Sequence, residues 1–237
     1  MAIDKVKALG FDVFGTVVDW RASVAREVRG LCAPKGIEVD WEAFATAWRA
    51  RYQPSMAKVR SGERPFVILD VLHRENLEGV LEAFGISGLT EPEKDHLNRA
   101  WHRLDPWPDS PPGLARLRKR YPLATLSNGN VALMVGLARH GNLPFDAILG
   151  AEVARGYKPD PQVYQTTARM LGLEPHELML VAAHNNDLVA ARAAGLRTAF
   201  VTRPTEHGPG QTIDLVAEHD FDVVAEDMLD LASRLGC

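Results

Sequence analysis

The sequence predicts an α/β protein with a doubly wound parallel sheet and a helical segment inserted after the first strand. Apolar runs of strand length recur at residues 6–11, 122–126, 178–183 and 198–202, and most are followed by a helical pattern that ends near a glycine. This alternation is typical of parallel sheets that carry helices on both faces. Between the first two runs the chain shows helical periodicity and no convincing strand, which predicts the insertion.

The interruption divides the chain into two predicted units. Residues 1–18 and 106–237 carry the alternation of strands and helices and form the predicted core, whereas residues 19–105 form a predicted helical cap. Apolar residues at helical spacing are visible in the cap at residues 41–48. Repeated prolines in residues 105–112 prevent a helix from continuing, so we interpret this segment as a stiff hinge that returns the chain to the core.

The composition is that of a globular protein, with 46% apolar and 24% charged residues. A net charge of −4 gives no basic excess, so nucleic acid is not an expected partner. No apolar run approaches the roughly 18 residues of a membrane span, and residues 1–5 lack the apolar stretch of a secretory signal. Cys32 and Cys237 make no disulfide framework, zinc spacing or redox pair, so we expect a protein of the reducing cytoplasm.

Asp12 follows the first apolar run and opens the segment Asp-Val-Phe-Gly-Thr at residues 12–16. A carboxylate that ends a buried strand before a glycine turn lies at the rim of the sheet, where open α/β proteins place their chemistry. Asp12 is therefore the candidate nucleophile. An aspartyl phosphotransferase would carry a second carboxylate two residues later to bind magnesium, whereas this chain has Phe14. The sequence predicts a site without a metal or another cofactor.

Residues 127–130, Ser-Asn-Gly-Asn, follow the second predicted strand. They offer a hydroxyl, an amide and free backbone N–H groups near the start of a helix, which suits an anionic substrate group. The alternative is a plain helix cap, because Ser and Asn are favoured at the N-terminus of any helix.

Two further clusters add a cation and a second carboxylate. Lys158 lies in a proline-rich turn ahead of the helix that contains Tyr164. Its charge would hold Asp12 ionised, although a lone lysine is ordinarily a surface charge. Asp187 follows the third predicted strand and would pair with Lys158. Alternatively, Asn186 or Asp187 caps the next helix.

Residues 12–16, 127–129, 157–160 and 186–187 fall in the order and spacing of the four motifs of the haloacid dehalogenase superfamily, across nearly the whole chain. Within that superfamily the sequence resembles the L-2-haloacid dehalogenases. The resemblance implies a Rossmann-like core with a helical cap inserted after the first motif. It also implies metal-free hydrolysis of short 2-haloacids to 2-hydroxyacids, carried out by a homodimer.

The resemblance further implies roles for the residues that match the family's motifs. Asp12 would be the nucleophile and would carry an aspartyl-ester intermediate. The pair Trp48-Arg49 matches a tryptophan–arginine pair of the family, which makes Arg49 the halide-binding arginine, assisted by Asn128. The rest of the catalytic and supporting set is Thr16, Ser127, Lys158, Tyr164 and Asp187.

The last motif departs from that of the better-known members, which have serine, asparagine and tryptophan where this chain has Ala182, His184 and Asn186. We interpret the change as a subtype and keep Asn186 in the predicted substrate-binding set. Hydrolysis of the ester requires a base for water, and the ordinary histidine pKa near 6.5 suits His184 to that role. A structural histidine is the alternative.

The chemistry sets two further requirements. Asp12 and a substrate carboxylate ~4 Å away repel each other by about 4 kcal/mol at an effective dielectric near 20, and Lys158 and the region of Ser127 would offset this. The pocket also needs an apolar wall, for which Phe14 and Trp20 are predicted because they flank the first motif, although aromatic side chains are more often plain core.

Two other functions compete with dehalogenation. A metal-dependent small-molecule phosphatase of the same superfamily is disfavoured by Phe14. A non-catalytic binding protein with this fold is disfavoured because Asp12, Lys158 and Asp187 are all present.

Overall fold

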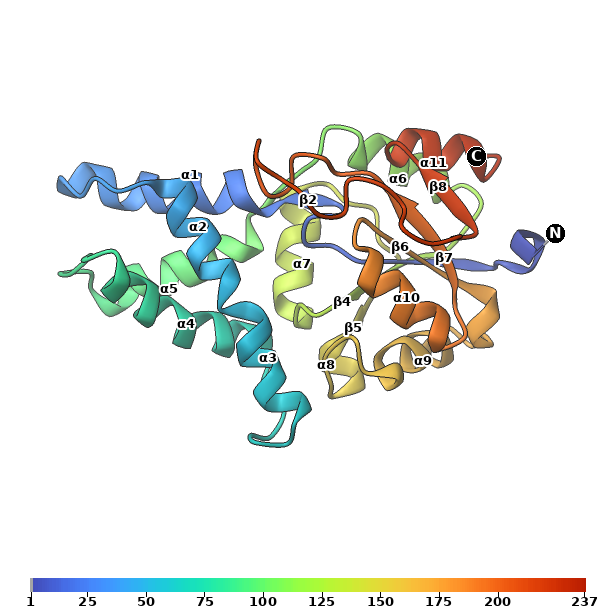
Figure 1. The fold of residues 1–237 in the computed structure, drawn as a ribbon, viewed down its shortest axis with the longest axis horizontal. Helices are drawn as coiled ribbons and strands as arrows, with labels where there is room; N and C mark the ends of the chain where they lie inside the picture. Colours follow the sequence, from blue (N-terminus) through green and yellow to red (C-terminus); the bar gives the residue numbers. More distant parts are fainter. Residues whose placement is uncertain (1) are drawn as a thin grey trace.

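A six-stranded sheet forms the centre of the computed structural model, which describes residues 2–237 (Figure 1). Its strands are β1 (Ala8–Phe11), β4 (Leu123–Ser127), β5 (Ala147–Gly150), β6 (Leu178–Ala182), β7 (Arg197–Val201) and β8 (Val223–Ala225). They lie in the order β5-β4-β1-β6-β7-β8, and all neighbours are parallel. The predicted doubly wound α/β fold is therefore confirmed. β1 lies between β4 and β6, so β4 and β5 are added on one side of β1 and β6 to β8 on the other. Open α/β sheets bind ligands at such a reversal of strand order.

The sequence predicts four of these strands and misses β5 and β8. Three of the four β5 residues are only half-buried, and β8 has three residues with an exposed one in the middle. Neither strand therefore gives a continuous apolar run. The central strands β1, β4 and β6 are buried at every residue, which is why their apolar runs are unbroken.

Helices cover both faces of the sheet. On one face, α6 (Ser110–Leu117), α7 (Val131–His140) and α11 (Met228–Arg234) contribute leucine and methionine side chains to the larger apolar core. On the other, α9 (Pro161–Met170) and α10 (Asn185–Ala193) contribute to a smaller core. The short helix α8 (Ala151–Ala154) follows β5.

A helical segment lies between β1 and β4 in the sequence. It is joined to the sheet through a short antiparallel pair, β2 (Val18–Asp19) and β3 (Asp105–Pro106). Its helices extend to one side of the sheet in Figure 1, coloured blue to green. They are α1 (Trp20–Cys32), α2 (Trp41–Ala50), α3 (Tyr52–Arg60), α4 (Leu69–Ala83) and α5 (Glu91–Asn98). Single turns of 3-10 helix lie at Ala2–Lys5, Ala33–Lys35, Arg99–His102 and Pro175–Glu177.

The proline-rich segment at residues 105–112 is only partly the hinge that the sequence predicts. Helix α6 already begins at Ser110, so Pro111 and Pro112 lie in its first turn. Proline is tolerated there because the first N–H groups of a helix have no partner within the helix. The connection without helix is therefore limited to residues 105–109.

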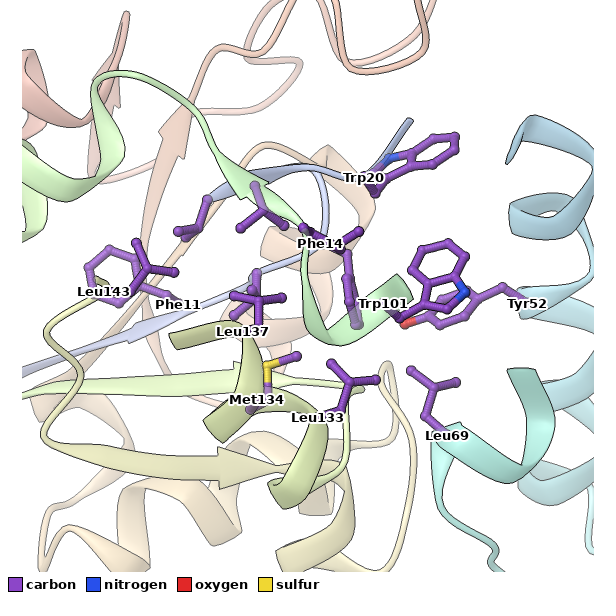
Figure 2. Packing of buried hydrophobic residues seen from close by; sticks show 14 of the residues in the cluster. Phe11, Phe14, Trp20, Tyr52, Leu69, Trp101, Leu133, Met134, Leu137 and Leu143 are labelled. Carbon is purple, nitrogen blue, oxygen red and sulfur yellow. The ribbon is translucent and has the colours of Figure 1, made fainter. Parts of the chain in front are cut away.

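The larger apolar core is continuous from the sheet into the helical segment. Figure 2 shows it running from Phe11, past Phe14, to Trp101. The Phe14 ring packs edge-on against both Trp101 and Tyr52. The residues directly after β1 are thus enclosed between the sheet and the helices. Among residues 2–237, no helix combines the length and apolar character that crossing a bilayer requires.

Candidate active site

Asp12 comes directly after β1 and is almost fully buried, with 7% of its surface exposed. Thr16 Oγ1 donates to Asp12 Oδ2 at 2.8 Å, and Lys158 Nζ donates to Asp12 Oδ1 at 2.8 Å. His184 Nδ1 lies 3.1 Å from Asp12 Oδ2. Burial alone would raise the pKa of Asp12, but Lys158 and His184 outweigh it and hold the pKa well below its ordinary value. The side chain is therefore a buried carboxylate that stays ionised.

Lys158 connects Asp12 to a second carboxylate. Its Nζ donates to Asp187 Oδ2 at 2.5 Å, and Tyr164 OH donates to Asp187 Oδ1 at 2.6 Å. Burial would lower the pKa of Lys158, but Asp12 and Asp187 raise it above the ordinary value. Burial and then Asp187 raise the pKa of Tyr164. The ammonium and the phenol hydroxyl thus both keep their protons, and the predicted pairing of Lys158 with Asp187 is present.

His184 occupies the N-cap position of α10 and lies between two carboxylates. Its Nε2 is 2.9 Å from Glu206 Oε2 and 3.1 Å from Oε1, while its Nδ1 faces Asp12. Burial would lower the pKa of His184, but Glu206 and Asp12 raise it well above 6.5. A neutral imidazole donates from only one nitrogen, so this arrangement favours the doubly protonated ring.

Glu206 is a site residue that the sequence analysis missed. It is 1% exposed, and it also accepts a hydrogen bond from Trp20 Nε1 at 2.9 Å. Burial would raise the pKa of Glu206, but His184 lowers it. Glu206 lies in the loop after β7, whose apolar run was recognisable, and polar residues after that run were the available signal.

Gly15 is required by this arrangement. Its φ of +87° lies in the left-handed region, and a Cβ built on it would overlap the carboxylate of Glu206. The glycine of the first motif therefore both makes the turn and leaves room for the partner of His184.

Arg49 projects from α2 into a cage of aromatic rings. Its Cζ lies 4.1 Å from the ring centroid of Tyr52 and 5.6 Å from those of Phe14 and Trp20. Its Nη1 is buried without a hydrogen-bond partner. A guanidinium with an unused buried N–H is suited to an anion. The neighbouring Arg51 is exposed and donates to the carbonyl of Gly79 at 2.9 Å.

The segment after β4 is organised by its own polar side chains. Ser127 Oγ accepts from the N–H of Gly129 at 3.1 Å, and Asn128 Oδ1 accepts from the N–H of Lys158 at 2.8 Å. Asn130 occupies the N-cap position of α7, yet its side chain makes no capping bond and pairs instead with Asp70 of the helical segment. The side chain of Asn130 therefore does not act as a helix cap, which was the alternative for residues 127–130.

One predicted site residue does not join the others. Asn186 lies in the first turn of α10 with an exposed side chain, and neither Asn186 nor Asp187 occupies the cap position. The neighbouring Asn185 is buried and binds Asp214 and the loop around it.

The residues around Asp12 do not fit a divalent metal. Both oxygens of Asp12 and both oxygens of Asp187 already accept from N–H or O–H donors. Phe14 supplies no oxygen and packs among aromatic rings. Within the described part of the chain, no group of three or more His, Cys, Asp or Glu side chains is placed to hold a metal ion.

The fold and this strand-end aspartate define the class of protein. The sequence profile of the haloacid dehalogenase-like hydrolases matches residues 6–195, and the chain belongs to that family. Several of the proteins it resembles are (S)-2-haloacid dehalogenases. It is 31% identical to (S)-2-haloacid dehalogenase 1 of Pseudomonas sp. (strain CBS-3) over 206 residues, which cover 85% of this chain and 86% of that protein.

Two solved structures are similar over almost the entire chain. The defluorinating L-2-haloacid dehalogenase Rha0230 has a TM-score of 0.96 at 52% identity, covering 98% of this chain and 96% of that one. The L-2-haloacid dehalogenase PA0810 has a TM-score of 0.94 at 49% identity, covering 97% and 98%. The resemblance drawn from the four motifs is confirmed.

Proposed function

We propose that the protein hydrolyses short (S)-2-haloacids to 2-hydroxyacids through an ester on Asp12, without a metal. The observation that carries this proposal is the buried, ionised Asp12 held by Lys158, with Phe14 where a metal-dependent relative would have a carboxylate. Support for the substrate class comes from the named activities of the similar proteins.

In the first step, an oxygen of Asp12 attacks C2 of the substrate. A bond forms between that oxygen and C2 as the carbon–halogen bond breaks, and the halide leaves with the electron pair. Lys158 offsets the repulsion between Asp12 and the substrate carboxylate. The backbone N–H groups after Ser127 are the proposed site for that carboxylate.

Arg49 is the proposed halide site. Negative charge grows on the halogen as the bond breaks, and a donor already positioned by aromatic rings stabilises it without reorganising. Phe14 and Trp20, both buried beside Arg49, form the apolar wall around the reacting carbon.

In the second step, water attacks the carbonyl of the ester. Ester formation neutralises Asp12, so His184 loses one of the two anions that stabilise its extra proton. Nδ1 then releases that proton to solvent and becomes the base for water. Nε2 keeps its proton and continues to donate it to the Glu206 carboxylate. The products are the 2-hydroxyacid and the Asp12 carboxylate. Over both steps one water is consumed, and one halide and one proton are released.

The helical segment is the proposed cap. We divide the chain into a core of residues 1–18 and 106–237 and a cap of residues 19–105, which supplies Arg49 and excludes water during the first step. The proposed assembly is a homodimer, which size-exclusion chromatography with light scattering tests directly. The proposed location is the cytoplasm.

Halide release in the presence of EDTA tests the reaction. The panel comprises both enantiomers of 2-chloropropionate and 2-bromopropionate together with fluoroacetate, and Asp12→Asn is the inactive control. We expect turnover of the (S)-enantiomers without added metal. Turnover that requires magnesium, or cleavage of a phosphate ester instead of the haloacids, would favour the phosphatase.

A single turnover in oxygen-18 water tests the ester. Attack of water on the ester carbonyl leaves label in the Asp12 carboxylate, which peptide mass spectrometry detects. Label that appears first in the hydroxyacid indicates direct attack of water on C2 and contradicts the covalent route.

A further inference from the structure

The turn that follows Asp12 presents three consecutive backbone carbonyls, and each accepts a hydrogen bond from outside the turn. Trp107 Nε1 donates to the carbonyl of Gly15 at 2.8 Å. Arg203 Nε donates to that of Thr16 at 2.9 Å, and the backbone N–H of Trp107 donates to that of Val17 at 3.0 Å. The donors come from two distant parts of the chain, the hinge after β3 and the loop after β7.

The side chain of Arg203 is itself held by the hinge. Its Nη1 and Nη2 donate to the two oxygens of Asp109 at 2.8 and 2.7 Å, and Nη2 also lies 3.3 Å from Ser110 Oγ. Its Cζ lies 5.5 Å from the ring centroid of Trp107. Arg203 is 6% exposed, so this forked ion pair is shielded from water. We call Trp107, Asp109 and Arg203 the carbonyl clamp.

We propose that the carbonyl clamp positions the nucleophile, with Arg203 acting on Asp12 through Thr16. The proposal rests on the proposed function, in which Asp12 attacks the substrate. Arg203 fixes the backbone of Thr16, whose hydroxyl accepts from the N–H of Ala183 at 2.9 Å and donates to Asp12 Oδ2. With its acceptor side occupied, the hydroxyl proton points to Asp12, and a shift of the turn moves the carboxylate with it.

The carbonyl clamp is also connected to His184, the proposed base, through Glu206. Arg203 and Glu206 belong to one loop, in which the N–H of Glu206 donates to the carbonyl of Arg203 at 3.3 Å. Arg203 therefore anchors the loop that presents Glu206 to His184. Since Asp109 lies at the end of the hinge, the clamp ties the exit of the helical segment to both the nucleophile and the base.

The residue types suit this role. Only a planar guanidinium has enough donors in a fixed fork to bind a carboxylate with two nitrogens and a carbonyl with the third. In-line attack depends on the placement of the reacting oxygen, and a displacement of ~1 Å can slow such a step by about 100-fold.

Removing the forked pair as a unit tests positioning separately from folding. The variant Arg203→Met with Asp109→Leu replaces both charges by apolar side chains of similar volume, so it leaves no unpaired buried charge. The matched control is Arg197→Met with Asp222→Leu, which removes an Arg–Asp pair at the opposite end of β7. In that pair too the carboxylate accepts a backbone N–H, that of Thr198, as Asp109 accepts that of Met228.

The readout is the rate of halide release in a single turnover, which reports formation of the Asp12 adduct even where the adduct does not accumulate, measured well below the thermal midpoint of each variant. We expect adduct formation to slow roughly 10- to 100-fold in the clamp variant and to stay near the wild-type rate in the control. The clamp is refuted if both variants keep the wild-type rate, or if both slow in proportion to their lost thermal stability.

A single hydrogen bond is tested by Trp107→Phe, which keeps an aromatic ring and removes the donor to Gly15. We expect roughly 2- to 10-fold slower adduct formation, which corresponds to the free energy of one lost hydrogen bond. Trp41→Phe on the first turn of α2 is its control. This variant keeps the proposal testable if the double variant does not fold, and a wild-type rate in it contradicts the clamp. A wild-type protein that releases no halide in a single turnover would refute the proposed function itself, and the role of the clamp with it.

Discussion

The carboxylate of Asp12 and the imidazole of His184 contact each other through Oδ2 and Nδ1, 3.1 Å apart. The other nitrogen of His184 is held by Glu206, so the ring is an imidazolium as long as Asp12 is charged. An ester on Asp12 removes that charge. The proposed base is therefore inactive before the first step and becomes available when its substrate, the ester, has formed.

Replacing His184 by alanine is expected to stop the second step and spare the first. Lys158 and Thr16 still hold Asp12, so ester formation continues, whereas no base then serves the water. The ester accumulates and raises the mass of the intact protein by that of the bound carboxyalkyl group. His140→Ala, which removes an exposed histidine paired with Asp105, is the control and should leave turnover unchanged. An inactive His184 variant without adduct would place the role of His184 before alkylation.

Replacing Glu206 by glutamine is expected to change the pH dependence of ester hydrolysis. The Glu206 anion stabilises the imidazolium and raises the pKa of His184, so removing its charge lowers that pKa. Because the neutral ring is the base, the acid limb of the hydrolysis rate moves to lower pH, by about 1 to 3 units. The decay of a preformed adduct, measured from pH 4 to 9, checks this. An acid limb that stays in place or moves upward contradicts the pairing.

The sequence predicted the parts of the fold that depend on local pattern. Strands β1, β4 and β6 are buried throughout, so their apolar runs are visible without a structure. The polar residues that follow them come together because parallel strands end at one edge of the sheet. That rule places Asp12 and Asp187 at the same edge, where Lys158, from the turn before α9, contacts both.

The parts that were missed depend on tertiary contacts. Glu206 is 22 residues from His184 in the sequence and lies in a loop without regular structure, so no periodicity marks it. Asn130 occupies a cap position, but its side chain binds Asp70, 60 residues away, rather than capping α7. The motif predicts Asn186 as a substrate-binding residue, but in the first turn of α10 its side chain is exposed to solvent.

Replacing Gly15 by alanine is expected to destabilise the protein and disturb the His184–Glu206 pair. The new Cβ meets the Glu206 carboxylate, and the backbone at φ +87° adds strain. Gly62→Ala is a matched control, because Gly62 has φ +77° and open space around its Cβ position. We expect Gly15→Ala to lose about 1 to 3 kcal/mol more in urea unfolding than Gly62→Ala. Equal losses would mean that Glu206 moves aside without cost.

Replacing Arg49 by lysine is expected to lower the rate of halide release roughly 10²- to 10³-fold. The guanidinium stacks on Tyr52 and keeps one buried N–H unpaired, whereas an ammonium is more strongly hydrated and cannot stack in the same way. Halide release, measured at saturating substrate, and inhibition by added iodide, measured at subsaturating substrate, should weaken together because they report on one site.

Arg51→Ala provides the matched control from the same helical segment. Arg51 is exposed and donates to the carbonyl of Gly79, so its loss should cost about 0.5 to 1.5 kcal/mol of stability and leave halide release unchanged. Arg51→Ala removes a positive charge two residues from Arg49, whereas Arg49→Lys keeps one, so a general electrostatic effect would slow the Arg51 variant and spare the Arg49 variant. Only a halide held directly by Arg49 predicts a large loss in the Arg49 variant and none in the Arg51 variant. If the Arg51 variant loses activity and the Arg49 variant keeps it, the halide site must be reassigned.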